Sequence, residues 1–170
     1  ASIVGLNGFV LAAHTSLGVK TVKEFVDYVK ARPGKLAYAS GGNGSISHLS
    51  AAMFAHRAGL DMVHVPYKGG AAAVADLVAG QVAMYFGNFS EVVPHGKSGR
   101  VNVLGVSTDK RDLQLLEIPT INETYNGFRT VTWNGLVAPA GTPRDILDRI
   151  ALEIQKGLKD PQLIDRLHRI

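Results

Sequence analysis

Apolar residues along this chain alternate between two spacings, one typical of β-strands and one typical of helices. An unbroken apolar run at residues 9–13 and a valine-rich stretch at residues 101–107 predict strands, the first of them buried. Apolar residues three and four positions apart predict an amphipathic helix over residues 21–32, where Thr21 and Glu24 have the spacing of a capping box. The two patterns follow each other over most of the sequence.

The same spacings predict the remaining elements. We expect strands at residues 36–40, 62–67, 82–86 and 130–138, and helices at residues 47–58, 71–79, 91–95, from 143 and from 160, the last still continuing at Ile170. The helix over residues 47–58 should take Ser45 or Ser47 as its N-cap. Its expected buried face carries Leu49, Ala52, Met53 and His56. The helix from 143 should have Thr142 as N-cap and Pro143 as its first residue.

Strand–turn–helix units repeated in this way indicate an α/β fold, in which a mostly parallel sheet carries helices on both faces. Ligands of such sheets bind beyond the carboxyl ends of the strands. Three predicted strands are followed by glycine-rich turns, at residues 41–44, 68–70 and 87–90. We therefore expect the three turns to lie at one edge of the sheet, each leading into a helix N-terminus.

The first of these turns has the features of an anion site. Its glycines allow a ligand to approach the backbone, and the first N–H groups of the following helix have no partner within the helix. The spacing fits neither a Walker A motif nor a dinucleotide-binding fingerprint. A flexible connection with an ordinary helix cap is the alternative. The candidate ligand-binding residues are Ser40, Gly41, Gly42, Asn43, Gly44, Ser45, Ser47 and His48.

The second and third turns add polar groups at the same predicted edge. Tyr67 offers a hydroxyl group, Lys68 a positive charge and Gly69 a backbone N–H. Asn88 offers both a donor and an acceptor. Alternatively, Lys68 is a solvated turn residue and Asn88 only caps the helix that follows. Neither a nucleophilic triad nor paired carboxylates accompany these turns, so the pattern suits binding an anion better than transforming one.

Composition narrows the class of function. The 170 residues carry a formal charge of +4 without a basic run, which gives little support to nucleic-acid binding. The absence of cysteine excludes disulfides and thiolate chemistry. The histidines show no metal-ligand spacing, and no cofactor is expected. No signal peptide or membrane-spanning run is visible, and because the chain opens in the middle of a pattern we expect a fragment of a longer protein.

Four ordered motifs resemble the Bug family, the TctC-like extracytoplasmic solute receptors of tripartite tricarboxylate transporters. They are Pro33-Gly34-Lys35-Leu36-x-Tyr38-Ala39-Ser40, Gly42-Asn43-Gly44-Ser45-x-x-His48-Leu49, Val63-x-Val65-Pro66-Tyr67-Lys68-Gly69 and Trp133-x-Gly135-Leu136-x-Ala138-Pro139-Ala140-Gly141-Thr142-Pro143. The motifs occur in order, and the resemblance covers essentially the whole chain.

This resemblance implies a periplasmic binding protein with two α/β lobes of the type II, three-layer kind and a cleft that holds a small carboxylate, such as an amino acid, dicarboxylate or tricarboxylate. It also implies docking on a membrane permease. Residues 1–16 would cross over from lobe one, residues 17–126 would form lobe two, and residues 127–170 would return to lobe one. By this resemblance the family's N-terminal lobe would be missing from this chain, and the exposed apolar faces of the chain's own last helices could drive homo-oligomerisation.

Two alternatives to a carboxylate receptor remain open from the sequence. The first is an enzyme acting on an anionic small molecule, for which His48 is the candidate base. The second is a truncated fragment that acts only through protein–protein contacts. The receptor is the leading hypothesis, and we expect no enzymatic activity.

Overall fold

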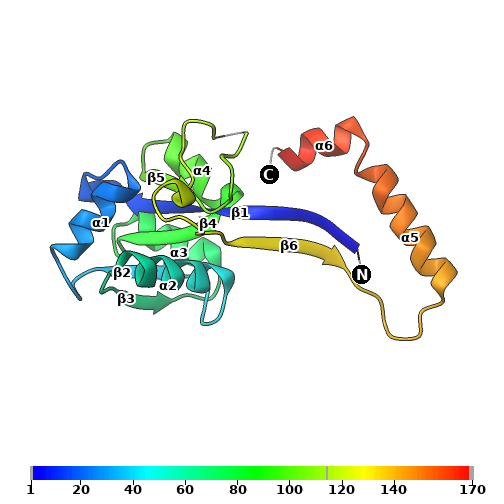
Figure 1. Cartoon of the computed structure of the whole chain (residues 1–170), viewed down its shortest axis with the longest axis horizontal. Helices are drawn as coiled ribbons and strands as arrows, with labels where there is room; N and C mark the ends of the chain where they lie inside the picture. Colours follow the sequence, from blue (N-terminus) through cyan, green and yellow to red (C-terminus); the bar gives the residue numbers. More distant parts are fainter. Residues whose placement is uncertain (1, 114, 169–170) are drawn as a thin grey trace. The chain divides into compact units, whose positions relative to one another are not determined.

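The computed structural model describes residues 2–113 and 115–168, which fall into two compact units (Figure 1). The sheet unit comprises Gly8–Val131, and the terminal unit comprises Ala1–Asn7 and Thr132–Ile170. The strand β1 (Ser2–His14) contributes residues to both units. The candidate site lies in the sheet unit.

The elements of the sheet unit follow the predicted alternation. After β1 come η1 (Thr15–Leu17), α1 (Val22–Lys30), β2 (Ala37–Ser40), α2 (Ile46–Ala58), β3 (Val63–Pro66), α3 (Gly70–Val78), β4 (Met84–Asn88), α4 (Phe89–Lys97), β5 (Val101–Val106) and η2 (Ile121–Glu123). The N-cap predictions hold for the first two α-helices, since the Thr21 and Ser45 side chains accept hydrogen bonds from the backbone N–H groups of Glu24 and His48. The predicted capping box of Thr21 and Glu24 is only half formed, because the Glu24 carboxylate accepts the Lys20 N–H at 2.7 Å.

The sheet has the strand order β3-β2-β4-β1-β5, and β6 (Val131–Leu136) also pairs with β1. β2 is parallel to both β3 and β4, as predicted, with Ser40 opposite Pro66 and Ala39 opposite Tyr85. β1 is antiparallel to β4 and β5. The sheet is therefore mixed, because a strand that enters from another unit need not share the direction set by βαβ crossovers.

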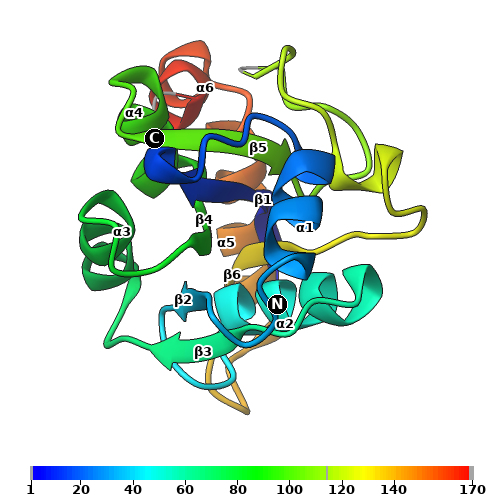
Figure 2. The ribbon, with the colours of Figure 1, turned by 90° about the vertical axis from the view of Figure 1, so that its left-hand side faces the viewer.

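The two faces of the sheet bury separate cores, because side chains of a strand point alternately to opposite faces. Phe9, Leu11 and Ala13 pack in the core beneath α1 and α2, whereas Val10 and Ala12 pack in the core beneath α3 and α4. Figure 2 shows these helix pairs on opposite sides of the sheet. The α/β architecture with helices on both faces is thus confirmed.

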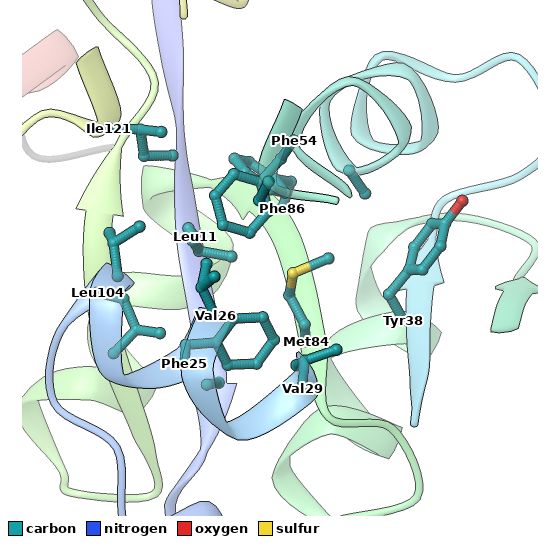
Figure 3. Close-up of a cluster of buried hydrophobic side chains, with 14 of the residues drawn as sticks. Leu11, Phe25, Val26, Val29, Tyr38, Phe54, Met84, Phe86, Leu104 and Ile121 are labelled. Carbon is teal, nitrogen blue, oxygen red and sulfur yellow. The ribbon is translucent and has the colours of Figure 1, made fainter. Parts of the chain in front are cut away.

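The core under α1 and α2 is rich in aromatic side chains. Phe54 is fully buried, and its ring lies 5.8 Å from that of Phe86 and 6.1 Å from that of Phe128. Figure 3 shows Phe54 and Phe86 in one cluster with Leu11 and Met84. This cluster joins α2 to the two strands at the centre of the sheet.

The predicted buried face of α2 is wrong. Leu49 is 53% exposed and His56 is also exposed, and Ala52 and Met53 are only partly buried. The buried residues are Ser47, Ser50, Ala51, Phe54, Ala55 and Ala58. The helix is rotated because this face offers one large ring between small residues, which lets the helix approach the sheet closely.

Two helix starts also differ from prediction. α4 begins at Phe89, directly after β4, so the third turn is reduced to the N-cap Asn88. In the terminal unit, α5 (Arg144–Gly157) has Pro143 as its N-cap, and the Thr142 hydroxyl donates instead to the Pro139 carbonyl at 2.8 Å. The Thr142 hydroxyl therefore closes the turn that precedes the helix.

The terminal unit consists of the start of β1, β6, α5 and α6 (Pro161–His168). The start of α6 after Asp160 is confirmed, and its expected continuation to Ile170 lies outside the described residues. Several apolar side chains of this unit are largely exposed: Leu6, Trp133, Leu136, Val137, Ile146, Ile150 and Leu152. No helix among the described residues is both long enough and apolar enough to cross a bilayer.

Candidate functional site

The glycine-rich turns meet at one edge of the sheet, as the alternation of elements predicted. β3, β2 and β4 are parallel neighbours, and a helix follows the carboxyl end of each. The Gly69 N–H donates to the Gly41 carbonyl at 3.1 Å, so the first two turns are in direct contact. The N-termini of α2, α3 and α4 therefore share this edge of the sheet.

The serine side chains of the first turn hydrogen-bond within the turn itself. The Ser45 hydroxyl donates to the Gly42 carbonyl at 2.7 Å, and Ser47 Oγ accepts from the Gly41 N–H at 2.9 Å. The Ser40 hydroxyl, which is fully buried, accepts from the Gly42 N–H at 3.1 Å. These hydrogen bonds hold the turn in one conformation, which reduces the entropy that binding would cost.

The backbone of this turn presents the available donors. Within the described residues, the N–H groups of Asn43, Ile46 and Ser47 have no hydrogen-bond acceptor. These N–H groups lie at the N-terminus of α2, which begins at Ile46 and where the helix dipole adds positive potential. Gly42 has φ 133°, and a Cβ there would lie 3.3 Å from the Tyr67 carbonyl oxygen, so a larger residue would disturb the turn.

His48 and His64 form a stacked pair beside the turn. Their ring centroids are 4.0 Å apart with an angle of 9° between the planes, and Tyr38 stacks on His64 at 5.0 Å. His48 Nδ1 accepts the Gly44 N–H at 3.1 Å, which places the proton of the neutral ring on Nε2. His64 Nε2 lies 2.7 Å from the Ser40 hydroxyl. Both rings therefore support the turn from its side.

Sequence analysis did not single out His64, which alternates with valines along its strand. The signal was present in the register, because parallel pairing of β2 and β3 places His64 opposite Tyr38 and two positions from Ser40. The described residues contain no group of three or more histidine or acidic side chains that could hold a metal ion. The histidine pair thus acts through hydrogen bonds and stacking.

Acid is expected to destabilise the sheet unit through His64. Burial, and secondly the neighbouring His48, lower the pKa of His64 below its ordinary value of 6.5. The unfolded chain therefore binds a proton at a pH where the folded chain does not, so the free energy of unfolding is highest above that value and falls as the pH drops through the folded-state pKa. Thermal unfolding between about pH 8 and about pH 5 measures this loss.

The variant His64→Gln removes the titration while an amide group can still bond to Ser40. We expect its melting temperature to depend less on pH than that of the wild type. His56→Gln, at an exposed position on α2, is the matched control and should keep the wild-type dependence. Equal pH dependence in His64→Gln and the wild type would contradict the prediction.

The three predicted residues of the second turn, Tyr67, Lys68 and Gly69, have different surroundings from one another. The Tyr67 hydroxyl donates to Asp76 Oδ2 at 2.6 Å, and burial with this bond raises the pKa of Tyr67 to about 12. This hydroxyl group is therefore directed to α3. Lys68 is exposed, and Gly69, with φ 110°, is the N-cap of α3. Tyr67 and Gly69 contact the first turn through their backbones, since the Tyr67 N–H donates to the Ser40 carbonyl at 2.9 Å and the Gly69 N–H to that of Gly41.

The third turn contains a carboxylate that sequence analysis missed. Glu91 Oε2 accepts the Asn88 N–H at 3.2 Å and the Tyr85 hydroxyl at 3.2 Å. Burial, followed by the charge of Glu91, raises the pKa of Tyr85 well above its ordinary value. The signal was the spacing of Asn88 and Glu91, which form a capping box at the start of α4.

A cavity of about 300 Å³ lies elsewhere in the sheet unit, between α4, β5 and the segment around Leu115. Its lining includes Lys20, Lys97 and Glu117, together with the buried Val101 and two partly buried valines. None of the predicted site residues lines this cavity. The glycine-rich edge is accordingly the candidate site, because the backbone N–H groups without acceptors lie there.

Comparison with known proteins identifies relatives of this chain. It is 38% identical over 153 residues to the UPF0065 protein in the tcbD-tcbE intergenic region of Pseudomonas sp. (strain P51), which covers 89% of this chain and 46% of that protein. Among solved structures, R. palustris Rpa4515 with adipate superposes with a TM-score of 0.92 at 30% identity, over 98% of this chain and 56% of that one. The chain thus spans about half the length of these relatives.

The periplasmic binding protein BugD superposes with a TM-score of 0.83 at 32% identity, over 97% of this chain and 56% of that one. These superpositions confirm the predicted periplasmic-binding-protein-like fold. The family described as "tripartite tricarboxylate transporter family receptor" (TctC) matches residues 1–170. The resemblance found in the four sequence motifs is therefore confirmed, and the chain belongs to the TctC receptor family.

Proposed function

We propose that this chain is the carboxylate-binding part of a periplasmic solute receptor that delivers its ligand to a membrane permease. The observation that carries the proposal is the first glycine-rich turn, which is held by its own serines and leaves three N–H groups at the start of α2 without acceptors. A ligand carboxylate would accept these groups at the positive end of the helix dipole. The relative Rpa4515, solved with adipate, supports this ligand class.

We also propose how the chain divides within a complete receptor. Residues 17–126 correspond to lobe two, residues 1–16 to a crossover, and residues 127–170 to part of lobe one. Support comes from the chain's own division into two compact units and from its coverage of only 56% of Rpa4515. The other lobe would supply the opposite wall of a cleft that closes on the ligand. Association through the exposed apolar residues of the terminal unit stays a prediction.

The enzyme alternative receives little support from the site. His48, its candidate base, already accepts the Gly44 N–H through Nδ1, and no carboxylate among the described residues hydrogen-bonds to its ring. The matched family is one of receptors, and BugD is a binding protein. We therefore assign binding to this edge of the sheet.

An amide NMR titration with mono-, di- and tricarboxylates tests the proposal. We expect saturable shifts at Asn43, Ile46 and Ser47 with at least one class of acid, at millimolar affinity if one lobe supplies the contacts. Shifts confined to other parts of the chain, or no shift with any acid at tens of millimolar, would exclude this turn as the carboxylate site.

A variant at the first residue of α2 tests the backbone donor directly. Ile46→Pro removes one N–H, and proline is well tolerated at this helix position. Ser45, with φ −64° and ψ 158°, already has the conformation that a following proline requires. We expect the dissociation constant to rise about tenfold, the effect of losing one hydrogen bond to a charged group. Ile46→Ala, which keeps the N–H but also loses the side chain, should bind within about threefold of the wild type.

A further inference from the structure

The side chain of Glu91 lies where the second and third glycine-rich turns meet. Its Oε2 atom accepts hydrogen bonds from the Asn88 N–H and the Tyr85 hydroxyl. On its other side the carboxylate faces Gly70, the first residue of α3, and a Cβ at Gly70 would lie 2.6 Å from Glu91 Cδ. Because Gly70 has no side chain, there is room for the Glu91 carboxylate beside it.

Glu91 is also close to the first turn. A Cβ at Gly41 would lie 3.6 Å from the Gly70 nitrogen, so Gly41, Gly70 and the Glu91 carboxylate follow one another in contact. The site thus combines N–H donors at the start of α2 with a negative charge that borders the adjoining second turn. This charge is a fixed part of the edge, because α4 and β4 both hold it.

The two oxygens of Glu91 differ in their surroundings. Oε2 has two donors, whereas Oε1 has no hydrogen-bond donor within the part of the chain that the structure describes. The residue as a whole is half-buried. A second negative charge nearby would be repelled, whereas a hydroxyl or ammonium group of a ligand would give Oε1 its missing donor.

We propose that Glu91 is a specificity-determining residue, which makes the site prefer carboxylates that carry a hydroxyl or ammonium group beside the carboxylate over the unsubstituted acids. This inference rests on the proposed function, because the first turn must hold the ligand carboxylate. The discrimination arises because an acid without a donor leaves Oε1 unpaired against an approaching anion. An ammonium group also gains direct charge attraction, so it should give the larger preference of the two.

Two matched series of acids test the inference on the chain as it exists. Propionate, lactate and alanine share one carbon skeleton, and succinate, malate and aspartate share another. Titrations followed at the amides of Asn43, Ile46 and Gly70 give a dissociation constant for each acid. We expect the hydroxyl or amino acid of at least one series to bind about tenfold more tightly than its unsubstituted partner, the effect of one charge-assisted hydrogen bond.

The variant Glu91→Gln keeps the side-chain length and an acceptor for the Asn88 N–H while removing the charge. We expect it to bind the unsubstituted acid more tightly and to reduce the preference to about threefold or less. Glu117→Gln, an exposed carboxylate beside the separate cavity, is the control for net charge and should keep the wild-type preference.

The outcomes separate the inference from the proposed function. If unsubstituted acids bind as well as their hydroxyl and amino partners, or if Glu91→Gln keeps the full preference, the role of Glu91 is overturned and the carboxylate site stands. If none of the six acids shifts the amides of the first turn, both are overturned. The preference of the wild-type chain for hydroxyl and amino acids is itself a test. The inference can therefore be tested even if Glu91→Gln does not fold.

Discussion

Replacing Phe54 with alanine is expected to lower the free energy of unfolding of the sheet unit by about 3–5 kcal/mol, the largest effect of any substitution considered for this chain. Phe54 is fully buried and lies at the centre of an aromatic cluster. Its ring centroid is 5.7 Å from Tyr125, 5.8 Å from Phe86, 6.1 Å from Phe128 and 6.4 Å from Phe25. Alanine would leave a cavity between α2 and the sheet that these large rings cannot refill.

Urea denaturation followed by far-UV circular dichroism measures this loss. A change of this size is a large part of the stability of an ordinary domain, so part of the variant protein should already be unfolded without urea. Leu49→Ala on the same helix is the control, because Leu49 is 53% exposed and its truncation should change the free energy of unfolding by less than about 0.5 kcal/mol. If Leu49→Ala lowered the free energy of unfolding more than Phe54→Ala, the buried face predicted from the sequence would be the correct one.

Gly87→Ala is expected to destabilise the sheet unit by about 1–3 kcal/mol, although it adds only one methyl group. A Cβ at Gly87 would lie 2.5 Å from Val92 Cγ2 and still closer to Tyr85 Cε1. Both neighbours are almost fully buried, so neither can move aside without disturbing the core under α3 and α4. Gly87 leaves room for the Tyr85 ring to lie across the strand, from where its hydroxyl group reaches Glu91.

The same substitution should therefore weaken the bond that holds the Glu91 carboxylate. Chemical denaturation gives the stability change, and the amide shifts of Asn88 and Gly70 report whether the third turn has moved. Gly5→Ala is the control, since no atom lies within 4 Å of a Cβ there. It should be nearly neutral, and a loss at Gly87 no larger than that at Gly5 would refute the packing argument.

Local sequence determined most of the elements and the place of the candidate site. Alternating apolar runs gave the strands, and capping residues such as Thr21 and Ser45 gave the helix starts, because both depend on groups only a few residues apart. The sequence also predicted that the turns after β2, β3 and β4 share one edge. That prediction needs only the rule that crossovers make neighbouring strands parallel.

Tertiary packing decided which helix face is buried. Almost every position of α2 is apolar or small, so a stripe through Leu49 and a stripe through Phe54 fit the helical period equally well. The contact of Phe54 with aromatic rings from β4 and from the segment after η2 selects one stripe. Those partners are distant in sequence, so no local pattern could identify them.

Tertiary structure alone also decided the chemistry at the edge. In the sequence, His64 looked like an ordinary strand residue and Glu91 like an ordinary residue of a helix cap. Their roles depend on pairing between strands. The register of β2 and β3 brings His64 to Ser40, and the neighbouring positions of α3 and β4 enclose Glu91 between Gly70 and Tyr85. The sequence by itself therefore determined where the candidate anion site lies. The fold decided which side chains support the candidate site and which charge borders it. Hydrogen bonds and charge interactions act through space, between strands that are far apart along the chain.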